Sequence, residues 1–175
     1  MKWLLVLVGV LVALVVVVTI IGALLPKGHV ARRTARYRQR PEVIWKAITD
    51  YDAFPAWRSD VESVEKLPGR DGLPAWREKS RHGEIPLEVT EAQPPTRLVT
   101  RIADPNLPFG GFWTYEITPL AEGGAQLTIT ENGEVYNPVF RFVSRFIMGH
   151  SASIEAYLRA LGKKFGEDVT PQLVS

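Results

Sequence analysis

The sequence predicts an α+β protein: an antiparallel sheet of about seven strands packed against a long C-terminal helix and preceded by one transmembrane helix. Three observations lead to this prediction. Residues 3–25 carry no charge; short segments of alternating polarity, separated by turn residues, fill the middle of the chain; and apolar residues recur every three or four positions after residue 138. The part that follows the uncharged run has about 150 residues, the usual size of a single domain.

Residues 1–26 are predicted to form a membrane anchor. The uncharged run spans 23 residues, and a helix of that length is about 34 Å long, enough to cross a hydrocarbon core of about 30 Å. A cleavable signal peptide is the alternative, but it expects an apolar run of about 7–15 residues and an Ala-x-Ala-like cleavage site. No Ala-x-Ala occurs near the end of this run, and Pro26 followed by Lys27 fits a helix end at the lipid boundary. A retained single-pass anchor is therefore favoured.

Basic residues are concentrated directly after this segment, in a juxtamembrane strip at residues 27–40. The strip carries six Lys and Arg and no acid, whereas residues 41–175 carry 14 basic and 19 acidic side chains. The side of a membrane span that is richer in Lys and Arg stays cytoplasmic, which predicts a cytoplasmic domain. Arg32, Arg36 and Arg38 are candidate contacts for anionic lipid; the alternative is a topology signal on the solvent face of a strand. The acidic body argues against binding of nucleic acid.

The elements of the domain follow from periodicity and turn residues. Residues 29–40 alternate with a period of two, which predicts a first strand with one basic face. Pro41 suits the first position of a short helix that ends near Asp50, and a second short helix or turn covers 51–57. Six extended segments bounded by Pro, Gly or Asp come next: Val61–Leu67, Ala75–His82, Ile85–Ala92, Arg97–Ala103, Phe112–Pro119 and Ala125–Tyr136. Their short connections predict an antiparallel meander.

The last element is predicted to be the longest helix outside the membrane, starting after Pro138. Apolar residues from Val139 to Phe165 recur at three- and four-residue steps, so they are expected to form one continuous apolar stripe. The first part of this helix, residues 140–148, is apolar on almost all sides. It must therefore be covered on more than one side.

Particular segments add a resemblance to a known family. The segment PEVIWKAITD at 41–50, followed by FPAW at 54–57, resembles the opening signature of the SRPBCC superfamily. The segments VTEAQPPTRL at 89–98 and AQLTITE at 125–131 resemble later strands of that superfamily. It includes START lipid-transfer domains, the birch-pollen-allergen group, polyketide cyclases and dehydrases, and coenzyme-Q-binding proteins. The resemblance implies a helix-grip fold for residues 29–168, a curved sheet around the final helix, with 169–175 as a tail.

The resemblance also implies a cavity between the sheet and the helix that holds an apolar or aromatic small molecule. Strand and helix periodicity then indicates which side chains face the cavity. The expected lining residues are Trp76, Leu87, Val89, Leu98, Trp113, Tyr115, Ile117, Leu127, Ile129, Phe146 and His150. Trp45, Asp50 and Trp57 are expected to be structural residues of the opening signature.

Glu78, His82 and Glu131 are the candidates for acid–base chemistry, because burial in an apolar cavity can raise the pKa of a carboxyl group. Each has a structural alternative: His82 adjoins the turn at Gly83, and Glu78 can pair with a neighbouring arginine. The histidines lack metal-binding spacing and the chain has no cysteine, so neither a metal site nor a cofactor is expected.

Three functional hypotheses follow. The leading one is membrane-tethered binding or transport of a hydrophobic small molecule, such as a lipid, a quinone or a polyketide-like aromatic, without chemistry. The second is an enzyme of the polyketide cyclase or dehydrase type that uses cavity carboxylates. The third is a protein-interaction module, which needs no cavity.

Overall fold

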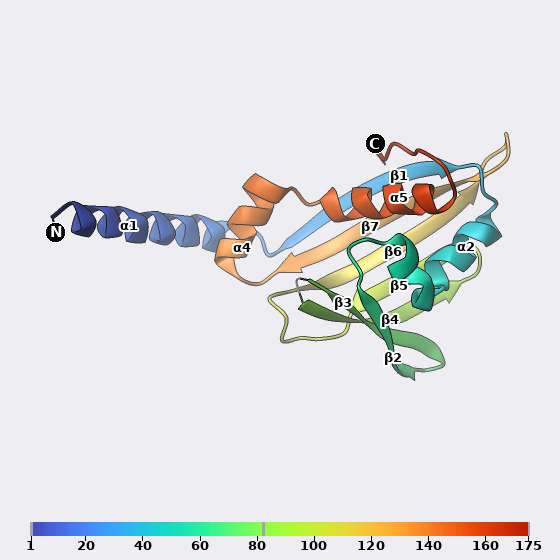
Figure 1. The fold of residues 1–175 in the computed structure, drawn as a ribbon, viewed down its shortest axis with the longest axis horizontal. Helices are drawn as coiled ribbons and strands as arrows, with labels where there is room; N and C mark the ends of the chain where they lie inside the picture. Colours follow the sequence, from blue (N-terminus) through green and yellow to red (C-terminus); the bar gives the residue numbers. More distant parts are fainter. Residues whose placement is uncertain (1, 82, 175) are drawn as a thin grey trace.

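A computed structural model describes residues 2–81 and 83–174 of the chain. The helices are α1 (Lys2–Leu24), α2 (Pro41–Thr49), η1 (Tyr51–Ala53), α3 (Phe54–Trp57), α4 (Pro138–Val143), η2 (Ser144–Met148) and α5 (Ala152–Lys164). The strands are β1 (Gly28–Tyr37), β2 (Ser63–Arg70), β3 (Leu73–Ser80), β4 (Gly83–Gln93), β5 (Arg97–Ile102), β6 (Phe109–Pro119), β7 (Ala125–Val135) and β8 (Gln172–Leu173). An apolar helix leads into an open antiparallel sheet; α5 lies against one face of this sheet, and α4 lies beside the end of α1 (Figure 1).

The predicted meander is confirmed, and the sheet has eight strands in the order β2-β3-β4-β5-β6-β7-β1-β8. β1 closes the meander by pairing with β7 from Gly28↔Glu134 to Tyr37↔Ala125. The eighth strand comes from the segment that was expected to be a tail. Within that segment Leu173 pairs with Arg33 of β1, and Val169 is buried in the core.

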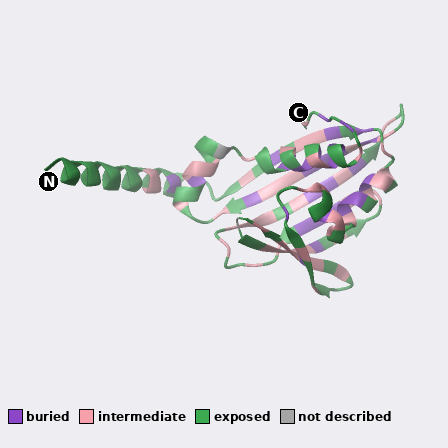
Figure 2. Cartoon of the chain, in the orientation of Figure 1, coloured by how far each residue is buried: buried purple, intermediate pink, exposed green. Residues whose placement is uncertain are grey.

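The core lies between the sheet and α5. Residues 154, 157, 158 and 161 of α5 are buried, and their three- and four-residue spacing places them on one face of the helix. The facing strand residues, such as Leu127 and Ile129 of β7, alternate with outward-facing ones. Figure 2 shows the buried residues gathered in the strands beneath α5, whereas α1 is exposed along nearly all its length.

The prediction of one continuous helix from Val139 to Phe165 is wrong. The Asn137 side chain caps α4, accepting hydrogen bonds from two main-chain N–H groups, and η2 ends at Gly149 with φ 74° and ψ 154°. Glycine adopts this left-handed φ at little cost, whereas an L side chain there is strained. The apolar stripe is therefore cut in two: α5 covers the sheet, and α4 packs against α1 (Figure 1).

The junction between α1 and α4 is close. Gly22 is the buried residue of α1, and a Cβ at this position would overlap the carbonyl of Pro138. Arg141 of α4 donates from Nη1 to the carbonyl of Leu25 at 3.0 Å and from Nη2 to that of Tyr136 at 3.0 Å. A guanidinium beside these carbonyls satisfies acceptors that lack a partner within α1 and complements the negative end of its dipole.

The positive charges of the basic strip at residues 27–40 are partly balanced by glutamates of the folded domain. Of the three arginines that were expected to meet anionic lipid, Arg32 and Arg36 lie on the face of β1 that points away from α5, and Arg38 follows the strand. Each has a carboxylate nearby. The pairs are Arg32–Glu116 at 3.3 Å, Arg36–Glu122 at 3.8 Å and Arg38–Glu167 at 3.8 Å. The first two pairs are exposed and each contributes at most about 1 kcal/mol to stability, whereas the Glu167 side chain is only 7% exposed. All three pairs reduce the positive charge of the strip.

Candidate functional site

A cavity of about 620 Å³ lies between the concave face of the sheet and the helices. This volume is within the range of about 300–1,000 Å³ that is typical of small-molecule sites. One end is walled by aromatic residues of the core, including Tyr51, Trp76 and Tyr157. The other end reaches Phe109 of β6 and Phe140 of α4. The cavity thus extends from the core of the domain toward the junction with α1.

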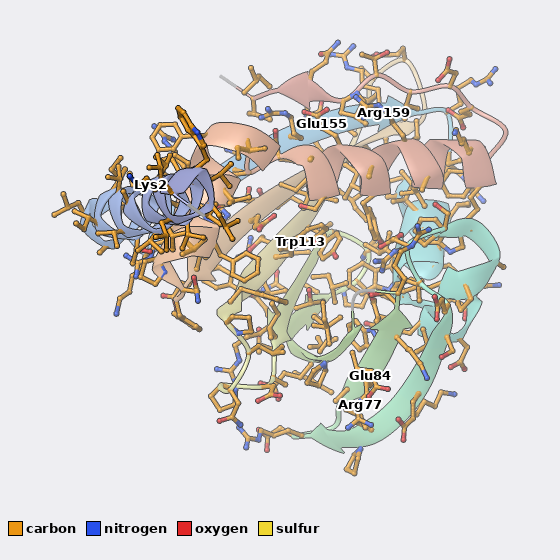
Figure 3. All side chains as sticks on the ribbon, turned by 60° about the vertical axis from the view of Figure 1, so that its left-hand side comes forward. Lys2, Arg77, Glu84, Trp113, Glu155 and Arg159 are labelled. Carbon is orange, nitrogen blue, oxygen red and sulfur yellow. The ribbon has the colours of Figure 1, made fainter. Side chains whose placement is uncertain are left out.

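The aromatic end is built by alternate residues of β3 and β6 together with the first short helices. Tyr51 stacks on Trp76 with ring centroids 3.8 Å apart, and Trp113 and Tyr115 approach the ring of Tyr157 at 6.0 and 5.8 Å. Figure 3 shows Trp113 between α5 and the strands opposite it. These rings pack against one another, so each helps to fix the position of its neighbours in the wall.

Arg58, at the end of α3, brings a positive charge to this wall. Its Nη1 donates to Oε1 of Glu78 at 2.9 Å, and its Nη2 donates to Asp60 at 2.7 Å. The indole N–H of Trp76 donates to the same Glu78 oxygen at 3.1 Å. Burial opposes ionisation of Asp60, but the hydrogen bond and charge of Arg58 prevail and lower its pKa. The geometry fits the structural alternative for Glu78, as the counter-ion of a buried arginine.

A second polar cluster surrounds Glu131, toward the other end of the cavity. Its Oε1 lies 3.3 Å from Nε2 of His29, and its Oε2 accepts from the Ser153 hydroxyl at 3.3 Å. The His29 ring stacks on that of His150, with centroids 3.9 Å apart. Burial raises the pKa of Glu131, and hydrogen bonds from Ser153 and Trp113 oppose this shift. Glu131 is thus a cavity carboxyl whose pKa its surroundings raise.

The candidate acid–base residues are not brought together. Glu78 lies on β3 and Glu131 on β7, with β4, β5 and β6 between them. At about 4.8 Å per strand, this separation is roughly 19 Å along the sheet. His82 lies outside the described residues. Among the residues that the structure describes, no group of three or more His, Asp or Glu side chains could hold a metal ion.

The expected cavity residues occupy three kinds of position. One group lines the cavity: Trp76, Leu87, Leu98, Trp113, Tyr115 and His150. A second group is buried in the core and does not reach the cavity wall: Val89, Ile117, Leu127 and Ile129. Phe146 lies outside the cavity and is 60% exposed, because the break at Gly149 turns its segment away from the sheet.

Residues that the sequence did not single out also contribute. His29 reaches Glu131 because β1 pairs with β7, where Ala31 is opposite Glu131 and His29 is two residues away on the same face. If the pairing of β1 with β7 had been known, His29 could have been identified as a neighbour of Glu131. Arg58 enters the cavity because α3 folds over the sheet, and no sequence pattern indicates this. Tyr157 lines the cavity, and its hydroxyl oxygen is buried and lacks a hydrogen-bond partner among the described residues.

The stacked histidines predict a loss of stability in acid. Partial burial lowers the pKa of both His29 and His150 below 6.5, and for His150 the neighbouring His29 and Arg145 add to this effect. The unfolded chain therefore binds protons at a higher pH than the folded chain does. The free energy of unfolding should then fall as the pH drops from about 7 to about 5.5. The raised pKa of Glu131 acts in the opposite sense, because there the folded state takes up the proton first.

This pH dependence is checked by urea unfolding of the full chain in mild detergent at several pH values, followed by tryptophan fluorescence. His150→Phe keeps an aromatic ring beside His29 but removes one titrating group, so its stability should change less over this range. An equal slope for the variant and the parent protein would show that the histidine pair does not cause the effect.

Comparisons with known proteins agree with this architecture. Residues 29–166 match the model of a family described as polyketide cyclase / dehydrase and lipid transport. A START superfamily protein from Mycobacterium smegmatis is 18% identical, with 78% of this chain and 96% of that chain covered and a TM-score of 0.63. Norcoclaurine synthase from Thalictrum flavum is 12% identical, with 80% and 87% covered and a TM-score of 0.62.

The di-domain ARO/CYC StfQ from the steffimycin biosynthetic pathway is 14% identical, with 79% of this chain and 52% of that chain covered and a TM-score of 0.62. At these sequence identities the structural matches establish the fold, and they do not identify a ligand. None of the curated proteins compared with the chain matches it.

Proposed function

Because this chain belongs to the polyketide cyclase / dehydrase and lipid transport family of the SRPBCC superfamily, we propose that it binds or transfers a hydrophobic small molecule beside a membrane. Lipids, quinones and polyketide-like aromatics are the ligand classes that fit. The observation that carries the proposal is the cavity of about 620 Å³, which is lined mainly by apolar side chains and extends to the α4 segment that packs on α1. A cavity of this size argues against the third hypothesis, a protein-interaction module, because such a module needs no cavity.

Binding is driven by removal of apolar surface from water. The aromatic wall, which includes Tyr51, Trp76 and Tyr157, accepts the ligand body. The charge of Arg58 is already balanced by Glu78 and Asp60. A neutral molecule therefore suits this end better than a free carboxylate, which these two acids would repel.

The tether is α1. It has 23 residues, and an 18-residue stretch of it has a mean hydropathy of 3.5, which fits a membrane span by length and composition; a signal sequence passes the same test. The junction supports a retained helix: Gly22 lies against Pro138, and Arg141 caps the end of the apolar segment. Cleavage would remove the partner of α4. A retained anchor keeps the cavity at high local concentration near membrane-soluble ligands, with the domain on the cytoplasmic side.

Solvent extraction of the purified full chain tests the proposal. Leu87 lines the cavity, and Leu87→Trp places an indole in the space that a ligand needs. We expect mass spectrometry to find a hydrophobic small molecule, at about one per chain, in extracts of the parent protein and of the control Leu87→Met, which conserves volume. The molecule should be lost from a folded Leu87→Trp protein. Lipid that only surrounds α1 should be extracted equally from the parent protein, Leu87→Met and Leu87→Trp. Identical extracts from the three proteins would therefore refute binding in the cavity.

The Glu131 cluster is the observation that favours the cyclase or dehydrase alternative. A carboxyl whose pKa is raised by burial, beside His29 in the cavity wall, can exchange a proton with a bound substrate. In that case Glu131→Gln should still carry a ligand, but one whose mass is that of the unconverted substrate. Because ring closure without loss of water conserves mass, the extracts are also compared by chromatography, and a ligand of unchanged mass and retention time favours a carrier.

A further inference from the structure

The segment formed by α4 and η2 exposes large apolar side chains. Phe140 is 57% exposed, Phe146 60% and Ile147 72%, and all three lie within eight consecutive residues. The rings of Phe142 and Phe146 contact each other, with centroids 4.9 Å apart. Contiguous exposed apolar side chains of this kind mark interaction sites or membrane contacts on a folded protein. The sequence pattern requires a cover on more than one side of this segment, and α1 supplies only one.

The position of the segment is set by α1. Gly22 allows backbone contact with Pro138, and Arg141 binds the carbonyls of Leu25 and Ala23, so α4 is held at the C-terminal end of the apolar helix. Figure 1 shows α4 beside that end of α1, between the helix and the sheet. If α1 spans a bilayer, this end lies at the lipid boundary, because Pro26 and Lys27 follow it directly.

We propose that α4 and η2 form a second membrane contact that inserts Phe140, Phe146 and Ile147 among the lipid chains next to α1. The proposal rests on the membrane-spanning role of α1 in the proposed function. Its occupant is the bilayer, because the exposed side chains are continuous with an apolar helix of membrane-spanning length. Lys27, just after α1, and Arg145, within η2, are exposed, and such long basic side chains can extend to lipid head groups while the apolar side chains insert.

This contact also gives the cavity an entrance from the membrane. Phe140 and Ser144 line the cavity from α4 and η2, and Pro108, in the loop that joins β5 and β6, and Phe109, at the start of β6, line it as well. The break at Gly149 lies at the same end and lines the cavity as well. With α4 and η2 at the bilayer surface, a hydrophobic ligand passes between the lipid chains and the cavity without crossing bulk water.

Depth-dependent quenching in vesicles tests the proposal. The chain has no cysteine, so single cysteines carry an environment-sensitive fluorophore at defined positions of the full chain. The positions are Ile147 in η2, Val10 in α1 and Ala121, an exposed residue in the β6–β7 turn at the opposite end of these strands. The protein is reconstituted in vesicles of phosphatidylcholine and phosphatidylglycerol. Lipids with nitroxides on their chains quench buried labels, and iodide quenches labels in water.

We expect the lipid nitroxides to quench the labels at Val10 and Ile147 at least threefold more than the label at Ala121, and iodide to show the reverse order. Iodide quenching at Ile147, with lipid quenching retained at Val10, would overturn the second contact but leave the tether intact. Loss of lipid quenching at Val10 would instead overturn the tether. A label at Ile147 that is shielded from both quenchers would mean that another copy of the chain covers the segment, which also overturns the proposal.

A second measurement tests the entrance. Phe146→Ser combined with Ile147→Ser removes apolar side chains that do not line the cavity. Quenching of cavity tryptophans by a short-chain quinone supplied in vesicles should become at least threefold slower, whereas its extent at equilibrium should be unchanged. An unchanged rate would overturn entry from the membrane at this segment.

Discussion

Replacing Glu78 with Leu is expected to lower the free energy of unfolding by about 3 kcal/mol. The substitution leaves Arg58 with a charge in a site where both partners are only 12% exposed. Breaking a buried pair by removing one partner typically costs about 3–5 kcal/mol, because the remaining charge is uncompensated. The lower part of that range applies because Asp60 still binds the guanidinium at 2.7 Å. The Trp76 indole also loses its acceptor.

Urea unfolding of the full chain in mild detergent measures this effect. The control is Glu65→Leu, which removes a carboxylate that accepts from Arg77 at 2.7 Å at the exposed edge of the sheet. An exposed pair contributes less than about 1 kcal/mol, so the control should remain close to the parent protein. If Glu78→Leu costs no more than Glu65→Leu, Glu78 is not the counter-ion of a buried arginine, and its role in the cavity must be reconsidered.

Leu158→Ala is expected to destabilise the domain by about 2–5 kcal/mol. The Leu158 side chain on α5 is 0% exposed and belongs to the core cluster between this helix and the sheet. Its truncation removes buried methyl groups and leaves a void that the surrounding strands fill only in part. The backbone contact that holds this turn, from the Tyr37 hydroxyl to the Leu158 carbonyl at 2.9 Å, stays in place. The loss therefore reports on packing alone.

The matched control for this change is Leu173→Ala in β8, where the side chain is 76% exposed. We expect a change within about 0.5 kcal/mol for this variant, with the same urea dependence as the parent protein. A similar loss for both variants would indicate that β8, and not the contact of α5 with the sheet, limits the stability of the domain.

The order and type of most elements were predictable because they rest on local rules. Alternation of polar and apolar residues with a period of two, between turn residues, predicts the strands, and Pro41 indicates the start of α2. Observed and predicted bounds differ by only a few residues, as for β3 at Leu73–Ser80 against Ala75–His82. The β8 strand was missed because it has two residues, too short for any periodic pattern.

The C-terminal helix shows the limit of such rules. The three- and four-residue spacing continues from Val139 to Phe165 even though the chain changes direction at Gly149. Periodicity is the same on both sides of the break, so it cannot reveal that α4 and α5 have different partners. The all-round apolar character of residues 140–148 was the available sign. It predicts more than one covering surface, and it does not identify which surfaces these are.

The sequence alone determined that an apolar helix precedes a domain built on an antiparallel sheet. This was possible because hydrophobic periodicity and the preferences of turn residues depend on near neighbours in the chain. Only the tertiary structure decided which polar groups meet. Pairing of β1 with β7 brings His29 to Glu131, and the fold of α3 brings Arg58 to Glu78, across 102 and 20 residues. It also placed α4 against α1, which sets one end of the cavity beside the apolar helix. Such contacts depend on the packing of whole elements, which no local spacing encodes.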